Sequence, residues 1–230
     1  MIRDGRVRLN GKSARDPETP VLEHHDHIAV DGTTIAAQKK IYLMMNKPCG
    51  IVTTASDEKG RQTVYDLLRA TAWDENLSKT RSSWVAPVGR LDKASEGLLL
   101  LTNDSEWSAR IAAPQSHLDK TYHVQIGMAA DEDLLRALVR GVKSNGEVLR
   151  AKQVRQLRAG GKNCWLEIVL DEGRNRQIRR MMEALGVGVL RLVRVAIGAL
   201  PLGELAKGQC RALTPGEKQM LDRALRARLW

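Results

Sequence analysis

The pattern of apolar and polar positions changes period along the chain, and four segments predict strands. The continuous apolar run from Gly97 to Thr102 predicts a strand buried on both faces. Residues 41–45 predict another strand, followed by a turn at Lys47-Pro48-Cys49-Gly50. The segments 120–126 and 164–170 have the alternation of strands with one buried face.

Helical spacing recurs between these strands. Residues 64–71 have apolar positions three and four apart, and 105–112 follow a capping residue at Asp104 or Ser105. A third helix ends at Gly141, and a fourth, over 174–185, has Gly186 as its C-cap. Because strands and short helices mix without a regular βαβ rhythm, the sequence predicts an α+β fold with a mostly antiparallel sheet and flanking helices.

The composition of the chain suggests three parts. Residues 1–36 predict a small basic module with a β-hairpin around Asn10-Gly11 and a short strand at 28–30. A main domain over 41–214 follows, and residues 215–230 predict a terminal helix with Thr214 as its N-cap. The run His24-His25-Asp26-His27 predicts a solvated loop, because adjacent side chains point in different directions and do not share a metal ion.

The charge of the chain points to a polyanion partner. Its 230 residues include 37 Lys and Arg against 27 Asp and Glu, a net charge of +10. Such a balance is typical of RNA- or DNA-binding proteins, although some basic proteins are merely soluble. The three isolated cysteines form no zinc or disulfide pattern, which favours the cytosol, and no apolar run is long enough to span a membrane.

Arginines gather between residues 174 and 194, where six of them stand against one glutamate, Glu183. A solvated helix face usually mixes charges at i,i+4 spacing, and this segment does not. One interpretation is an ordinary basic surface. The other is a face that contacts phosphates and also supplies a partner to an internal carboxylate.

Asp92 is the candidate for that carboxylate. Asp92 follows Gly89-Arg90-Leu91 and precedes the apolar run. Burial of its carboxylate near this strand is costly unless the negative charge has a partner. An arginine would hold it ionised, as a nucleophile or cation stabiliser; a structural salt bridge is the alternative. The sequence has no phosphate-cradling Gly-rich loop and no GxSxG motif, and no second carboxylate in a comparable motif that would favour glycoside hydrolysis.

Four segments in order, "NKPCG", "VGRLDKASEGLLLLTND", "KTYHV" and "EGRNRQIRRMMEALGVGVLRLVRVAIG", resemble the Rsu-type family of bacterial ribosomal RNA pseudouridine synthases. The resemblance covers about residues 41–214. It implies a pseudouridine-synthase core built on a mostly antiparallel mixed sheet. The first 36 residues resemble the later part of a ribosomal-protein-S-four-like RNA-binding module whose opening helix is missing.

The resemblance also implies roles for particular residues. Asp92 would be the catalytic aspartate, Tyr122 would stack on the target base, and Arg179 would pair with Asp92. Arg90 would open the RNA stack and Leu192 would line the base pocket, with Lys47 and Pro48 near the site and in contact with substrate. Ser95 stands where many members carry threonine, and both supply a hydroxyl. From the arginine-rich segment we expect phosphate contacts by Arg174, Arg176 and Arg180.

The implied reaction converts a uridine of ribosomal RNA into pseudouridine, an isomer, so it requires neither a cofactor nor a metal. The expected partner is ribosomal RNA or a ribosomal subunit precursor, and the expected state is a cytoplasmic monomer with no membrane attachment. One alternative is a non-catalytic ribosome-assembly factor with the same fold. Another is a methyltransferase, which the absence of a Gly-rich methyl-donor loop disfavours.

Overall fold

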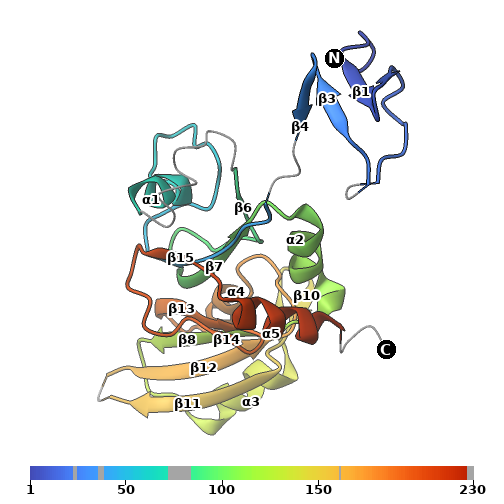
Figure 1. Cartoon of the computed structure of the whole chain (residues 1–230). Helices are drawn as coiled ribbons and strands as arrows, with labels where there is room; N and C mark the ends of the chain where they lie inside the picture. Colours follow the sequence, from blue (N-terminus) through green and yellow to red (C-terminus); the bar gives the residue numbers. More distant parts are fainter. Residues whose placement is uncertain (23–24, 36–38, 72–83, 161, 227–230) are drawn as a thin grey trace. The chain divides into compact units, whose positions relative to one another are not determined.

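The structure of the chain is a computed structural model that describes residues 1–22, 25–35, 39–71, 84–160 and 162–226. The chain divides into two compact units, residues 1–40 and 41–230 (Figure 1). The helix at the C-terminal end belongs to the larger unit. Each unit is described by itself.

The smaller unit is a four-stranded antiparallel sheet in the order β2-β1-β3-β4. Its strands are β1 (Val7–Leu9), β2 (Lys12–Ala14), β3 (Ile28–Val30) and β4 (Thr33–Ile35). The turns at Asn10-Gly11 and Asp31-Gly32 have positive φ at both central residues, as two-residue hairpins require. The predicted hairpin and strand are confirmed, whereas RNA binding by this unit stays a prediction.

The larger unit is built on a nine-stranded sheet with the main order β11-β12-β8-β13-β7-β5-β15. Among the described strands, β13 and β7 pair in parallel and the other neighbours pair antiparallel. This confirms the predicted α+β class. The strands of this sheet and of the separate hairpin are β5 (Tyr42–Lys47), β6 (Ala86–Pro87), β7 (Glu96–Thr102), β8 (Lys120–Ile126), β9 (Val142–Ser144), β10 (Glu147–Leu149), β11 (Gln153–Ala159), β12 (Cys164–Leu170), β13 (Val189–Ile197), β14 (Leu200–Pro201) and β15 (Cys210–Ala212).

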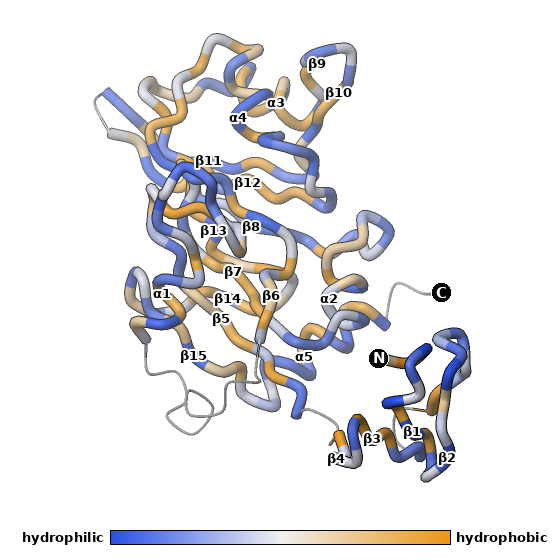
Figure 2. The backbone as a smooth tube through the Cα atoms, turned by 90° about the horizontal axis from the view of Figure 1, so that it is seen from above, coloured by the Kyte–Doolittle hydropathy of each residue, from blue (hydrophilic) through white to orange (hydrophobic). Residues whose placement is uncertain are grey.

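The central part of strand β7, residues 97–101, is apolar because helices cover both faces of the sheet at this point. Leu98 and Leu100 pack into one apolar cluster, and Leu99 and Leu101 pack into another. Figure 2 shows β5 and β7 in the colours of hydrophobic residues. A strand between two cores needs no polar face, which explains the continuous run in the sequence.

Three helical groups complete these cores. Helix α1 packs in the cluster with Leu99, helices α2 and α5 pack in the cluster with Leu98, and α3 and α4 cover β8 and β12. Leu221 and Leu225 bury the last helix in the larger unit. The helices are α1 (Val64–Ala70), α2 (Ser105–Ala112), α3 (Glu132–Arg140), α4 (Gln177–Ala184) and α5 (Pro215–Arg226), with a 3₁₀ turn η1 (Pro114–Ser116).

Local capping follows the sequence signals closely. Asp104 accepts a hydrogen bond from the backbone of Trp107 at 3.1 Å, and Thr214 caps α5 through its hydroxyl. At the end of α4 the C-cap is Leu185, and Gly186 is the next residue, with φ of +70°. The prediction was therefore one residue late: Gly186 and Val187 donate back to Glu183 and Met182 in a Schellman arrangement.

The described residues contain no group of three potential metal ligands and no helix long and apolar enough to cross a bilayer. In the predicted histidine loop, Asp26 accepts hydrogen bonds from Asn10 and from the backbone of Leu22, each at 2.8 Å. His24 lies outside the described residues. Cys49, Cys164 and Cys210 are free thiols.

Candidate active site

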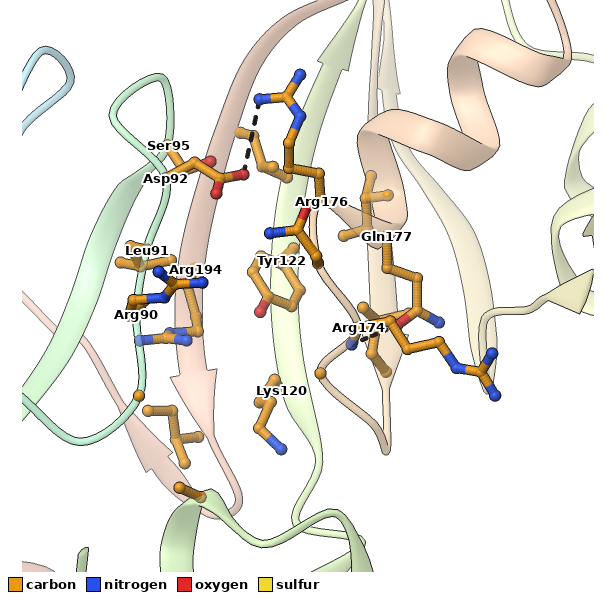
Figure 3. A pocket seen from close by; sticks show the side chains of 18 of the residues that line it. Arg90, Leu91, Asp92, Ser95, Lys120, Tyr122, Arg174, Arg176, Gln177 and Arg194 are labelled. Atoms are coloured by element: carbon orange, nitrogen blue, oxygen red, sulfur yellow. Dashed lines mark hydrogen bonds and ion pairs between the residues drawn. The ribbon is translucent and has the colours of Figure 1, made fainter. Parts of the chain in front are cut away.

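A cavity of about 320 Å³ opens beside the turn that joins β6 to β7. Its lining includes Asp92 from this turn, Tyr122 from β8, Leu192 and Arg194 from β13, and Arg176 from the start of α4. Figure 3 shows Tyr122 with Arg90 and Arg194 to one side of it and Arg176 and Gln177 to the other. The structure thus brings together residues that are far apart in the sequence, in a cavity of the size that binds small molecules.

The turn that carries Asp92, residues 89–95, is held rigidly. Gly89 supplies a φ of +70°, and the side chains of Val88 and Leu91 are buried beneath it. Each backbone carbonyl from Leu91 to Ser95 accepts a hydrogen bond. The donors, in order along the turn, are the Thr53 hydroxyl, the Ser95 amide, the Gly50 amide, the Arg179 guanidinium and the Lys47 ammonium, at 2.9, 2.9, 2.8, 2.7 and 2.8 Å.

The ion-pair partner of Asp92 in the structure is Arg176. Nη1 of Arg176 lies 4.0 Å from Oδ2 of Asp92, whereas Nη2 of Arg179 donates to the Ala94 carbonyl at 2.7 Å. The turn backbone engages the Arg179 guanidinium in this structure, and the expected pairing of Arg179 with Asp92 stays a prediction. Burial lowers the pKa of Arg179, Arg176 lowers it further, and Asp92 opposes both effects.

Arg176 is itself held in an unusual backbone conformation. It is the N-cap of α4 and has φ of +49°, in the left-handed region that residues other than glycine rarely adopt. Such a conformation costs of order 1–3 kcal/mol and is found disproportionately at functional sites. The strain places a guanidinium at the mouth of the cavity, next to the only carboxylate among the residues that line it.

The aromatic and apolar walls come from neighbouring strands. Tyr122 is half-buried and packs between two apolar clusters of the core. Leu192 is 6% exposed and lies on the adjacent strand. A planar ring fixed in this way can stack on a heterocyclic base, while Leu192 excludes water.

Arg90 lies at the boundary between two cavities. Its side chain is exposed and lines both the cavity of Tyr122 and a second, polar cavity of about 430 Å³. Thr53, Lys59 and Arg61 contribute to the second cavity. An exposed arginine in this position can reach into an RNA stack, and that role stays a prediction.

Lys47 is buried beneath the turn and does not line either cavity, so its contact with substrate stays a prediction. Its side chain is 0% exposed, and its ammonium donates to the carbonyls of Pro48 and Ser95 at 3.0 and 2.8 Å. Burial lowers its pKa to about 8. Lys47 therefore supports the turn from inside, and Pro48 lines neither of the two cavities.

Two of the expected phosphate contacts are engaged elsewhere. Arg180 donates to Glu147 at 2.7 Å and to the Ser144 carbonyl at 3.0 Å, which fastens the β9–β10 hairpin to α4. Arg174 pairs with Glu172 at 3.0 Å and with Glu147 at 3.4 Å, although it also lines the cavity. A role in phosphate binding stays a prediction for Arg174 and Arg180.

The sequence reasoning missed an ionic cluster behind the turn. Glu96 is 5% exposed, and its carboxylate accepts hydrogen bonds from Nε and Nη2 of Arg191 at 2.9 and 3.0 Å. Lys207 adds a contact at 2.6 Å, and the hydrogen bonds from Arg191 are the main cause that lowers the pKa of Glu96 to about 2. A glutamate at the start of a buried strand was a usable signal, but its partners are about a hundred residues away.

The fold and the arrangement of the cavity define an RNA-modifying enzyme of the pseudouridine synthase class. A family model described as RNA pseudouridylate synthase matches residues 41–184. The chain belongs to this family, and it is an isomerase that acts on uridine in RNA.

Similar proteins agree with this family. The chain is 35% identical over 223 residues to the ribosomal large subunit pseudouridine synthase B of Bacillus subtilis, covering 96% of this chain and 87% of the relative. It is 36% identical over 226 residues to an uncharacterized RNA pseudouridine synthase of Aquifex aeolicus, covering 98% and 87%. A crystal structure of a pseudouridylate synthase superposes with a TM-score of 0.67 at 31% identity, covering 96% of this chain and 90% of that one.

Proposed function

We propose that the chain converts a specific uridine of ribosomal RNA into pseudouridine, with Asp92 acting on a nucleotide that has swung out of the RNA helix. The observation that carries this proposal is the position of Asp92, on a rigid turn at the cavity that Tyr122 also lines. The name of the Bacillus subtilis relative favours large-subunit RNA as the substrate.

The residues around the cavity suit each step of the isomerisation. The bond between ribose C1′ and uracil N1 breaks, and its electron pair leaves with the base. An oxygen of Asp92 either bonds to C1′ or removes a proton from the ribose. Uracil then turns within the cavity and its C5 bonds to C1′; at this step the bond from Asp92 to C1′ breaks or, on the second route, Asp92 returns its proton to the ribose. C5 then loses its proton, and N1 gains one. The product has the same atoms as the substrate.

Access to the target requires extrusion of the nucleotide, which costs a few kcal/mol for a paired base. We propose that Arg90 occupies the space left in the RNA stack and that Tyr122 stacks on the extruded base. Arg176 and Arg174, which are exposed and line the cavity, would contact the flanking phosphates. The net charge of +10 supports binding to a polyanion, with the cytosol as the proposed place of action and a monomer as the proposed state.

The substitution Asp92→Asn tests the assignment of the catalytic group. It keeps the size of the side chain and removes the negative charge, so product formation should be abolished while RNA affinity changes by less than about threefold. Single-turnover assays on ribosomal RNA from a strain lacking the gene, with filter-binding measurements alongside, give both quantities. Pseudouridine formed at a normal rate by this variant would reject the role of Asp92.

Carbodiimide-based mapping of both large ribosomal RNAs, with and without the gene, tests the substrate. An enzyme leaves one or more positions unmodified in the deletion strain, and a plasmid carrying the wild-type gene restores them. A binding factor with the same fold changes none of them, and that outcome would favour ribosome assembly over catalysis.

A further inference from the structure

Arg194 is a buried cation that the preceding account leaves unexplained. Its side chain lies at the cavity wall, yet the residue is only 5% exposed. Nε donates to the carbonyl of Leu98 at 2.7 Å, while Nη2 is buried and has no hydrogen-bond partner. Within the described part of the chain no carboxylate lies within 4.0 Å of this guanidinium.

A buried charge without a partner is costly, so it calls for an explanation. Other arginines of the larger unit show the usual solution: Arg191, three residues earlier on β13, is paired with Glu96 through two hydrogen bonds. Arg194 instead faces a cavity that already contains Tyr122 and Leu192. The missing partner is therefore a group that enters this cavity.

The backbone of Arg194 is fixed relative to the Asp92 turn. Strand β7 begins directly after this turn, and Gly97 on β7 pairs with Arg194 on β13. A Cβ atom at Gly97, where φ is +102°, would lie 2.2 Å from the carbonyl oxygen of Arg194. Only glycine allows this approach, so the catalytic turn and the guanidinium are parts of one rigid assembly.

The position of Arg194 also limits the chemistry of its ligand. Phosphates remain on the outside of a folded RNA, where the exposed Arg90 and Arg176 can meet them. A group that reaches a guanidinium with 5% exposure must be small and pass Tyr122. In the proposed reaction, the uracil ring meets this description, and it gains negative charge on its carbonyl oxygens when the bond to ribose breaks.

We propose that Arg194 is a catalytic residue that donates a hydrogen bond from Nη2 to a carbonyl oxygen of uracil and stabilises the detached base as an anion. The bond from Nε to Leu98 orients the guanidinium in advance, so little reorganisation is needed when the charge develops. The inference rests on the proposed function, since it requires that uracil leaves the ribose in this cavity.

The experiment compares uridine with 5-fluorouridine at the target position of a ribosomal RNA transcript chosen by the mapping. Fluorine withdraws electrons and stabilises the uracil anion, so a substrate carrying it depends less on a cation in the enzyme. Arg194→Met should lower the single-turnover rate on uridine by about 10²–10³-fold. The loss on 5-fluorouridine should be about tenfold smaller, because less charge stabilisation is missing from its transition state. All rearranged nucleotide, free or enzyme-bound, is counted after denaturation.

Two variants keep this comparison decisive. Arg191→Met removes a neighbouring arginine that lines neither cavity, and its effect should be equal on the two substrates. Arg194→Lys keeps the charge and should show the same substrate dependence as Arg194→Met to a smaller extent, which preserves the test if the methionine variant does not fold. Equal losses on uridine and 5-fluorouridine in the Arg194 variants would overturn the proposal. Failure of the wild-type protein to rearrange uridine would instead reject the proposed function itself.

Discussion

Two clusters of arginines in the larger unit have opposite electrostatic designs. In the hairpin cluster, formed by Arg174, Arg180, Glu147 and Glu172, two cations meet two carboxylates at 2.7 to 3.4 Å. The turn cluster has four cations and one carboxylate, Asp92, whose ion pair with Arg176 is 4.0 Å long. The turn cluster consists of Asp92, Lys47, Arg176, Arg179 and Arg194.

This difference separates the charges that stabilise the fold, in the hairpin cluster, from those of the turn cluster, which remain available to bind a substrate. The hairpin cluster has no net charge, and each of its charged side chains has a partner of opposite charge. Its contacts are therefore explained by a structural role, the attachment of the β9–β10 hairpin to α4. The turn cluster contains Nε of Arg179 and Nη2 of Arg194, the two buried side-chain atoms of the described residues that lack a hydrogen-bond partner. An excess of positive charge around a cavity favours a polyanion and a reaction that develops negative charge.

After the Asp92 and Arg194 variants described above, the substitution Arg179→Ala should have the next largest effect within the turn cluster. It removes both a cation near Asp92 and the hydrogen bond to Ala94, so the single-turnover rate should fall by about 10²-fold while RNA affinity changes little. Arg176→Ala is the matched control and should cost only about tenfold, because this more exposed guanidinium leaves the turn backbone intact. If Arg179→Ala weakens binding more than turnover, Arg179 belongs among the phosphate contacts.

The buried ammonium of Lys47 predicts a particular pH dependence of stability. Its pKa is about 8 in the folded chain and about 10.4 when unfolded, so the unfolded state binds more protons between these values. The free energy of unfolding of the wild type should therefore rise with pH in this window, relative to Lys47→Met, by up to about 1.4 kcal/mol per pH unit. Urea titrations of both proteins between pH 7 and pH 10.5 measure the difference. A difference that does not change with pH would contradict the burial of a charged Lys47.

The smallest effect is expected in the hairpin cluster. Glu147→Gln weakens the contacts to Arg174 and Arg180, which are partly exposed, so the melting temperature should fall by a few degrees at most. The turnover rate should stay within about twofold of the wild type, because we expect no residue of the hairpin cluster to contact the reacting base. A large loss of turnover with unchanged stability would show that the two clusters are not separate.

The periodicity of the sequence was a good guide to individual elements. The apolar run before Thr102 and the capping residues Asp104 and Thr214 predicted β7, α2 and α5, because strand burial and helix capping depend on residues close together in the chain. Asp92 and Tyr122 were also identified as candidates, the first by its motif and the second by family resemblance. Both residues line one cavity of the structure, and their roles stay predictions.

The partners of the charged residues were much less accessible to sequence reasoning. Arg179 was expected to pair with Asp92 and in this structure donates to the Ala94 carbonyl, and Lys47 was expected to contact substrate and is buried. Arginine and lysine have long side chains with several rotatable bonds, so a small change in the path of the backbone decides which acceptor they reach. No local pattern encodes that choice.

Periodicity, capping and composition act over a few residues, so the amino-acid sequence alone was enough to predict the helices, several of the strands, the excess of positive charge and the candidate aspartate. Long-range packing was needed to bring β7 against β13 at Gly97 and to place Arg194 at the cavity, where no carboxylate of the described residues neutralises it. These residues are almost a hundred positions apart, and their contact depends on the register of two parallel strands, which no short segment of sequence specifies.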